Sequence, residues 1–400
     1  MPPTLAFGFW LAVLLFGYVY VGYPFVAWLR SYVSPRPHRR EPIVPLVTVV
    51  VVAHNEAVRI DERIQNLLAL DYPADRLDIV VASDGSTDDT VARARRHANS
   101  RVAVRAFAWR RGKAAVLNDV VCTARGEVVV LADARQTFER ESVKALVSNF
   151  ADPAVGAVSG ELTLGLGTSA TADGVGFYWR YEKFTRRHES RADSTVGVTG
   201  AFYAIRRPLF EPIPADTILD DVVIPMRVVR RGYRVVFDGT ARAVDRPSET
   251  AREELVRKTR TIGGTFQLFW CERWLLNPFR NRLWFETLSH KGLRLAAPVL
   301  KLVMLVCSVG LLDAPIYRLM LMGQFVFYAA AIAGWARATS LEFRASSPDR
   351  RAPRLLAVPY AICLVNWATI VAFTRFVTGR QRVTWERVLP PQAPETSWRS

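Results

Sequence analysis

Apolar residues gather in long uninterrupted runs at the two ends of the chain. Residues 5–29 contain no charged side chain, and neither do residues 319–335 or 355–373; residues 295–312 are apolar apart from Lys301. Runs of this length can cross a hydrocarbon core of about 30 Å as helices. Residues 1–4 lack the basic start of a cleaved signal peptide, so the first run is interpreted as a membrane helix. The pattern predicts three or four membrane-spanning helices.

Between these ends, short β-branched runs alternate with segments of helical periodicity. Strands are predicted at 47–53, 77–82, 101–106 and 127–131, and helices over 55–70, 84–98 and 113–123. This alternation predicts an α/β domain with a mostly parallel sheet and helices on both faces. In such sheets ligands bind beyond the carboxyl ends of the strands. Asn55, Glu56, Asp84 and Asp133 all fall there.

The rest of the central part is less regular. Strands are predicted at 157–164, 196–205 and 233–238, and a helix over 218–231 that ends at Gly232. Residues 270–291 mix Trp, Phe and Arg, which suits an amphipathic segment on the membrane surface. The predicted parts are an N-terminal transmembrane helix (1–35), an α/β domain (36–269), an interface segment (270–294), C-terminal transmembrane helices (295–378) and a tail (379–400).

The formal net charge is +16, and much of the excess flanks the apolar runs. Arg30, Arg36, Arg39 and Arg40 place residues 36–290 in the cytoplasm by the positive-inside rule. The flanks also suit contact with anionic membrane lipids. No basic-aromatic module of the usual kinds is present, which argues against nucleic-acid binding. The four cysteines show no CxxC spacing, so neither a disulfide framework nor a zinc site is predicted.

The topology of the C-terminal part stays open. Four spans would place Arg380, Arg382 and Arg387 on the outer side of the membrane, against the positive-inside rule. An alternative is that the apolar segment containing Lys301 lies in the membrane interface.

Two motifs place charged side chains where a nucleotide would bind. Asp84 lies in S-D-G-S-T-D, where a carboxylate at a strand end precedes a glycine turn; it could instead cap the next helix. Lys113 lies in R-R-G-K-A-A-V-L-N at a helix start, where lysine and helix dipole together can meet a diphosphate. The alternative for Lys113 is an ordinary solvated lysine.

Two further motifs place charges on later helices. Asp220 and Asp221 start a predicted helix, where carboxylates favour the helix dipole but can also supply a general base. Arg257, Lys258 and Arg260 form a basic group before two glycines. They suit a face near anionic lipid, or an inward Arg260 that binds a phosphate.

Taken in order, the motifs resemble those of membrane-integrated family 2 glycosyltransferases, in the branch of the cellulose, hyaluronan and poly-N-acetylglucosamine synthases. The motifs that carry the resemblance are V-V-V-V-A-H-N-E, S-D-G-S-T-D, R-R-G-K-A-A-V-L-N, L-A-D-A-R, G-V-T-G-A-F-Y-A-I-R-R, I-L-D-D-V and R-K-T-R-T-I-G-G. They cover roughly residues 45–290. The resemblance implies a GT-A fold and inverting transfer from a nucleotide-sugar, usually a UDP-sugar, with Mg²⁺ or Mn²⁺.

The resemblance also implies a role for individual residues. Those implied to bind the nucleotide-sugar are Ala53, Glu56 and Asp84 at the nucleoside, Lys113 and Arg260 at the phosphates, and Asp133 at nucleotide and metal. Asp221 matches the catalytic base. Gly200 and Asp220 match the acceptor side.

The chain departs from the family pattern in three motifs. In one of them, Leu219-Asp220-Asp221 replaces Thr-Glu-Asp and keeps the base. Arg135 replaces the second Asp of Asp-x-Asp, so the metal is held by Asp133, the diphosphate and waters, or Arg135 takes over part of the charge neutralisation. Arg257 and Thr261 replace the Gln and Trp of Gln-x-x-Arg-Trp, and that Trp flanks the acceptor sugar in the family. Processive polymerisation is therefore less secure than sugar transfer.

The expected function is transfer of a sugar to a glycan acceptor at the cytosolic face of the cell membrane, in exopolysaccharide or cell-surface glycan synthesis. One alternative is transfer of a single sugar to a lipid-linked or small acceptor. Others are an inactive membrane-anchored binding protein of the same fold and, less favoured by the large α/β domain, a transporter. The donor sugar and the participation of an accessory subunit stay open.

Overall fold

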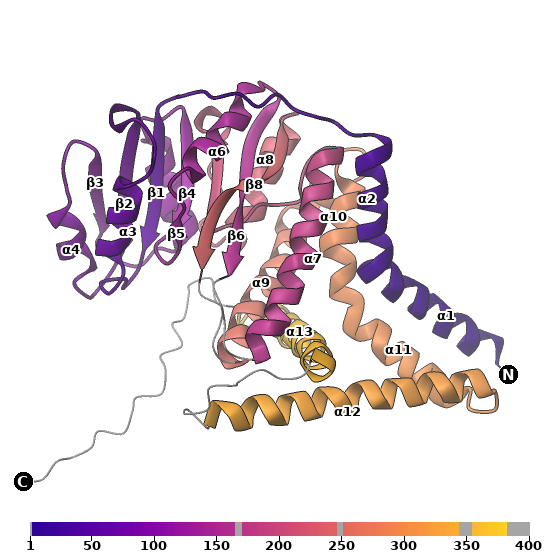
Figure 1. Cartoon of the computed structure of the whole chain (residues 1–400). Coiled ribbons are helices and arrows are strands. Elements are labelled where there is room, and N and C mark those ends of the chain that lie inside the picture. The colour runs from indigo at the N-terminus through magenta and orange to yellow at the C-terminus, as the bar shows by residue number, and fades with distance from the viewer. Residues whose placement is uncertain (1, 165–169, 246–250, 344–353, 382–400) are drawn as a thin grey trace, which may run out of the picture.

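The computed structural model of the chain describes residues 2–164, 170–245, 251–343 and 354–381. An α/β domain lies on one side of the molecule and a group of long apolar helices on the other (Figure 1). Between them stand α7 (Ala170–Ala192) and α9 (Ala251–Cys271). These two helices therefore join the domain to the apolar helices.

The α/β domain is built on one sheet of eight strands in the order β3-β2-β1-β4-β7-β6-β8-β5. The strands are β1 (Val47–Ala53), β2 (Leu77–Asp84), β3 (Val102–Phe107), β4 (Val128–Asp133), β5 (Thr137–Phe138), β6 (Val155–Leu164), β7 (Phe202–Arg206) and β8 (Arg234–Asp245). The first four are parallel, whereas β7 runs antiparallel to both β4 and β6. β8 is parallel to β6, and the sheet is therefore mixed beyond β4.

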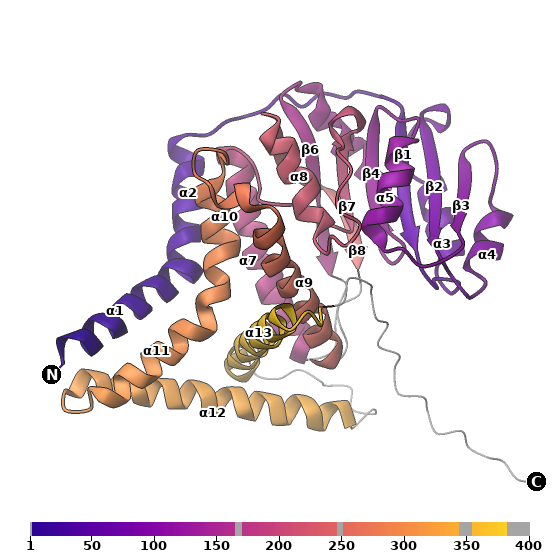
Figure 2. The same ribbon diagram turned by 180° about the vertical axis from the view of Figure 1, so that it is seen from behind.

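Helices cover both faces of the sheet, as predicted. α3 (Ile60–Leu68) and α6 (Ser142–Ser148) lie on one face, and α5 (Lys113–Cys122) and α8 (Asp220–Arg230) on the other (Figures 1 and 2). The valines of β1 alternate between the two resulting cores, and all but Val52 are fully buried. Because both faces of β1 are buried, neither face needs polar side chains, which explains the run of four valines from Val49 to Val52.

Several predicted boundaries change for local reasons. The strand at 47–53 is confirmed, but the helix predicted from residue 55 begins only at Ile60. Asn55 adopts a left-handed backbone conformation with φ of 55°, which asparagine tolerates but a helix does not contain. The strand predicted at 196–205 is wrong for its first half, because Gly197 has φ of 92° and the strand starts at Phe202.

Helix α7 was not predicted from the sequence. Its early residues A-D-G-V-G contain two glycines, which are unfavourable inside a helix, and its later part is rich in charged residues. It lies beside α2 (Tyr23–Val33) and β8 in the structure (Figure 1). Several of its charged side chains are buried there, which an amphipathic pattern does not reveal.

Four helical segments are long and apolar enough to cross a membrane: Pro3–Val33, Trp284–Gly310, Pro315–Thr339 and Leu355–Val377. They contain or largely coincide with α1 (Pro3–Gly17), α2, α10 (Trp284–Thr287), α11 (Ala297–Gly310), α12 (Pro315–Phe343) and α13 (Arg354–Val377). The segment containing Lys301 is one of the four. It begins at Trp284, before the predicted boundary at 295. Of the tail, residues 382–400, with Arg382 and Arg387, lie outside the described residues.

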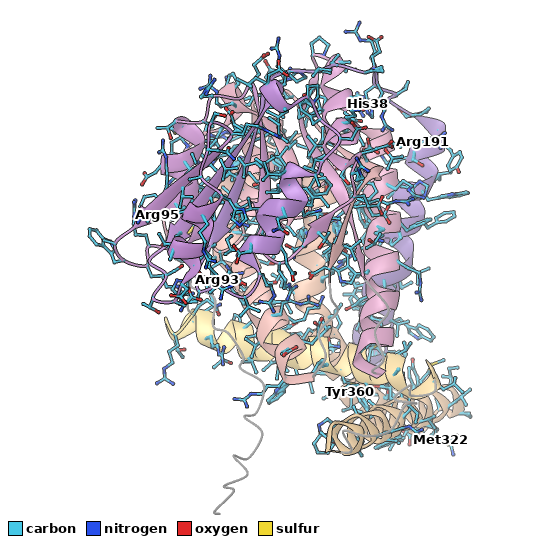
Figure 3. The ribbon with its side chains drawn as sticks, turned by 60° about the vertical axis from the view of Figure 1, so that its left-hand side comes forward. His38, Arg93, Arg95, Arg191, Met322 and Tyr360 are labelled. Carbon is cyan, nitrogen blue, oxygen red and sulfur yellow. The ribbon has the colours of Figure 1, made fainter. Side chains whose placement is uncertain are left out.

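Aromatic contacts fasten the α/β domain to the apolar helices. Phe266 of α9 lies 5.4 Å and 5.9 Å, ring centre to ring centre, from Phe373 and Phe376 of α13. Figure 3 shows the separation of the two parts, with His38 beside the α/β domain and Met322 and Tyr360 on α12 and α13. The aromatic rings of α13 therefore support the position of α9.

The two cores predict the cost of a cavity in the α/β domain. Ile64→Ala removes a fully buried side chain under α3 and is expected to destabilise the fold by about 2–5 kcal/mol. Val58→Ala, at a side chain that is 78% exposed, is the control and should change little. Chemical denaturation of detergent-solubilised protein measures both, and equal midpoints for the two variants would contradict this account of the core.

Candidate active site

The predicted site lies at the carboxyl ends of three adjacent parallel strands. Ala53 pairs with Ser83 of β2, and Val52 pairs with Asp133 of β4. Asp84 follows Ser83, so the two carboxylates flank the end of β1. Glu56 lies in the turn that follows, where its carboxylate pairs with Arg59 at 3.0 Å.

Asp84 shapes the loop that leads into α5. Its carboxylate accepts hydrogen bonds from the backbone N–H groups of Arg111 (2.6 Å) and Gly112 (2.9 Å). It does not cap α4 (Thr90–Arg96), because Asp88 accepts the N–H of Thr90 at 3.0 Å. Asp84 therefore fixes the backbone immediately before Lys113.

Lys113 is the centre of the site and is not a solvated lysine. Its Nζ lies 2.9 Å from Oδ1 of Asp133 and 3.3 Å from Oδ2 of Asp220, and it donates to the carbonyl of Gly200 at 3.3 Å. Burial alone would lower the pKa of Lys113, but the surrounding carboxylates raise it overall. The ammonium group therefore stays charged and holds three elements together.

Asp221 is enclosed by the loop before β7. The N–H of Val198 donates to its carbonyl oxygen at 2.9 Å, and a Cβ added to Gly200 would lie 3.0 Å from its Oδ2. Burial and the charge of Asp220 raise the pKa of Asp221 from 3.8 to about 6, against the opposing charges of Lys113, Lys291 and Arg186. A carboxylate with this pKa can accept a proton near neutral pH.

Arg260 reaches the same acidic group from α9. Burial lowers the pKa of this guanidinium, while the charges of Asp220, Asp221 and Asp133 act in the opposite direction. Its Nη2 donates to the carbonyl of Ile218 at 3.5 Å. The structure thus gathers six predicted residues in one place: Lys113, Asp133, Gly200, Asp220, Asp221 and Arg260.

Arg135 has a partner outside this group. Its Nη2 lies 2.5 Å from Oδ2 of Asp245, a carboxylate only 2% exposed that also accepts from Gln136 at 3.1 Å. Arg135 therefore neutralises Asp245 in this structure. Within the described part of the chain, no group of three or more His, Cys, Asp or Glu side chains is placed to hold a metal ion.

Three residues near the site were missed in the sequence. Arg186 of α7 and Lys291 carry two of the charges that act on Asp221. Tyr203 of β7 pairs with Leu131 of β4 and is fully buried. Burial and the nearby carboxylates raise the pKa of Tyr203 well above its usual value. Tyr203 lies in a quoted motif and Arg186 lies four residues after Glu182, but only the fold shows that both approach Asp221.

The fold and the site together define a class of protein. A solved structure of the mannosyltransferase PcManGT from Pyrobaculum calidifontis, in complex with GDP-Man and Mn²⁺, is similar with a TM-score of 0.67 and 22% identity, over 92% of this chain and 98% of that chain. The fold is the GT-A fold, as expected. Residues 48–213 match the family model described as glycosyl transferase family 2. The chain therefore carries a family 2 glycosyltransferase domain.

Curated relatives come from several bacteria. The probable glycosyltransferase YdaM of Bacillus subtilis is 26% identical over 55% of this chain and 55% of its own length. The β-monoglucosyldiacylglycerol synthase of Synechocystis is 32% identical over 28% of this chain and 25% of its own length. The poly-β-1,6-N-acetyl-D-glucosamine synthase of Staphylococcus aureus is 24% identical over 49% and 48%. The chain thus matches about half the length of these relatives, or less.

The raised pKa of Asp221 predicts a pH-dependent gain in stability when its charge is removed. Folding moves this pKa from 3.8 to about 6, so the folded state binds the extra proton and loses stability as the pH rises through this window. Asp221→Asn is therefore expected to stabilise the ligand-free protein above pH 6, by up to about 3 kcal/mol, and to differ little from the parent near pH 4.

Thermal unfolding at pH 8 and pH 4, without nucleotide or metal, measures this difference. Asp71→Asn is the control, because Asp71 is 49% exposed and pairs with Lys144 at the surface. A gain of equal size at both pH values would show that the charge of Asp221 is not destabilising.

Proposed function

We propose that the chain transfers a sugar from a nucleotide-sugar, usually a UDP-sugar in the branch it resembles, to a hydroxyl group of an acceptor, with inversion at the anomeric carbon. The observation that carries the proposal is the partly buried Asp221 with a pKa of about 6, next to a lysine, an arginine and the carboxylate of Asp133. Asp221 is suited to take a proton, the lysine and the arginine to hold phosphates, and Asp133 to hold a metal ion. Charged groups that are in position before the reaction strongly stabilise the charge that develops in the transition state, because water is excluded from the site.

The donor side of the site is basic. Lys113 is the first residue of α5, so its ammonium group and the positive end of the helix dipole can act on the same diphosphate. Arg260 adds a guanidinium from α9, which suits phosphate oxygens. Ala53, Glu56 and Asp84 lie at the strand ends where the nucleoside is proposed to bind.

The proposed reaction is a single displacement. Asp221 accepts the proton of the acceptor hydroxyl, whose oxygen forms a bond to the anomeric carbon as the bond from that carbon to the diphosphate oxygen breaks. The nucleoside diphosphate leaves with the bonding electron pair, and Lys113 and Arg260 stabilise its charge. Gly200 and Asp220 line the side from which the acceptor approaches Asp221.

A divalent ion, Mg²⁺ or Mn²⁺, fits this site through one protein carboxylate. Asp133 is 28% exposed and ends a strand, and the diphosphate and waters would complete the ligand set, as Mg²⁺ often requires. When bound, the ion supplies positive charge that stabilises the leaving diphosphate. The pairing of Arg135 with Asp245 leaves Asp133 as the proposed ligand.

The acceptor is proposed to be a glycan at the cytosolic face of the cell membrane, made for export or for the cell surface. Support comes from the four apolar helices, the basic flanks and the name of the Staphylococcus relative. A second candidate is transfer of one sugar to a lipid, favoured by Thr261 in place of the family's Trp and by the name of the Synechocystis relative. Membrane lipids surround the helices in both cases, and no nucleic acid takes part.

Release of the nucleoside diphosphate from a panel of nucleotide-sugars, in membranes that contain the protein, tests the proposal directly. Asp221→Asn is expected to lower turnover by at least about a thousandfold while the affinity for nucleotide stays within about twofold, because the asparagine cannot accept the proton. Turnover retained by this variant would remove Asp221 from the role of base, and Asp71→Asn should behave like the parent.

Removal of divalent ions is expected to abolish turnover and to weaken binding of the nucleoside diphosphate. Addition of Mg²⁺ or Mn²⁺ should restore both. Binding is measured by calorimetry with and without EDTA, with the free nucleoside as the control because it has no phosphate for the ion. Unchanged turnover in EDTA would exclude a required metal.

A further inference from the structure

Arg186 of α7 lies between the loop 197–200 and the buried carboxylate of Glu182. Its Nη1 donates to Oγ1 of Thr199 at 3.1 Å, and its Nε lies 3.4 Å from Oε1 of Glu182. The side chain is only 11% exposed. A guanidinium with two such partners has a fixed position, because its donors lie in a rigid plane.

Thr199 is the middle of the loop that encloses Asp221. Val198, before it, donates its N–H to the carbonyl of Asp221, and Gly200, after it, lies against the carboxylate. Thr199 itself is buried, donates to the carbonyl of Gly160 at 2.9 Å and receives the bond from Arg186. Arg186 therefore contacts a residue that stands between two residues lying against Asp221.

Glu182, the second partner of Arg186, also contacts the apolar segment Trp284–Gly310. Glu182 accepts hydrogen bonds from Nε2 of His290 (3.0 Å) and Nη1 of Arg294 (2.9 Å), and the Nδ1 of His290 lies 2.7 Å from Glu189. His290 is completely buried within the segment Trp284–Gly310. Both ring nitrogens of His290 therefore face carboxylates of α7, those of Glu182 and Glu189.

We propose that Arg186 is a positioning residue for the base Asp221, acting through Thr199, and that Glu182 and His290 tie this position to the membrane segment 284–310. The inference rests on the proposed function, since it concerns the residue proposed as base. Arg186, Glu182 and His290 take no part in the proposed reaction itself, and this inference gives these groups a function. A misplacement of about 1 Å at a catalytic group can cost about a hundredfold in rate.

Arg186 also contributes charge at Asp221. The charged and titratable groups that act on Asp221 are Asp220 (α8), Lys113 (α5), Tyr203 (β7), Arg186 (α7), Arg260 (α9) and Lys291 in the segment 288–292. Lys113, Lys291 and Arg186 lower the pKa of Asp221 against the effects of burial and Asp220. Loss of Arg186 therefore raises this pKa, and the base becomes protonated at a higher pH.

Three variants separate the position from the charge. Arg186→Met loses both, and we expect turnover to fall by about tenfold or more at an unchanged donor KM, with the acidic limb of the pH profile moved up by roughly half a unit. Arg186→Lys keeps the charge, so turnover falls but the acidic limb stays in place. Lys183→Met is the control, because Lys183 lies on the same helix and pairs with Glu161 at 2.6 Å.

Two further variants change residues on either side of Arg186: Thr199, toward Asp221, and His290, toward the membrane segment. Thr199→Val keeps the side-chain shape but removes the oxygen that accepts from Arg186, and His290→Gln removes the ring whose two nitrogens each face a carboxylate. Each should lower turnover without weakening nucleotide binding. Arg186→Met combined with His290→Gln should lose no more than the worse single variant, because both act on one path.

The outcomes distinguish this inference from the function on which it rests. Parental turnover and pH profile in Arg186→Met would overturn the inference, and additive losses in the double variant would overturn the tie to the membrane segment. If Arg186→Met does not bind nucleotide, Thr199→Val decides, and full activity in that variant overturns the inference. If the parent protein releases nucleoside diphosphate from no donor, the proposed function itself fails.

Discussion

The buried ammonium group of Lys113 is the interaction on which the rest of the site depends. Carboxylates from β4 and α8, and a carbonyl from the loop before β7, meet at this one cation. Without it, Asp133, Asp220 and Asp221 would stand close together in a buried place, and like charges there are costly. A buried ion pair adds little net stability on average, but loss of one partner is expensive. The pairing therefore fixes the geometry of the strand ends more than it stabilises the fold.

The same cation explains why the two neighbouring aspartates differ. Asp220 lies 3.3 Å from Lys113, whereas Asp221 is turned toward the loop 197–200 and has a pKa of about 6. Burial and the adjacent charge hold Asp221 ready to accept a proton. Two adjacent carboxylates at a helix start thus have separate environments, which suits one of them to the proposed role of base.

The sequence predicts much of this site because its residues follow strong local patterns. The valine-rich strand before His54 and the glycine before Lys113 identify a strand end and a helix start without any knowledge of the fold. The loop 196–201 was misread because β-branched residues there favour a strand, and only the positive φ of Gly197 prevents it. Helix α7 and the role of Arg186 were missed because buried ion pairs between distant segments leave no periodic pattern. Arg135 was noticed, but its partner Asp245 lies at the end of a strand far along the chain.

The match to the family model ends at residue 213, before the proposed base Asp221 and before Arg260. The part of the site beyond that point stands on α8 and α9, and α9 is held by the aromatic rings of α13. On the other side, α7 is held by His290 and by Tyr23, whose hydroxyl donates to Glu189. The proposed nucleotide side of the site therefore belongs to the sheet, whereas the proposed acceptor side is supported by helices outside the sheet. An acceptor that arrives from the membrane or leaves through it would meet the part of the site that the membrane helices hold in place.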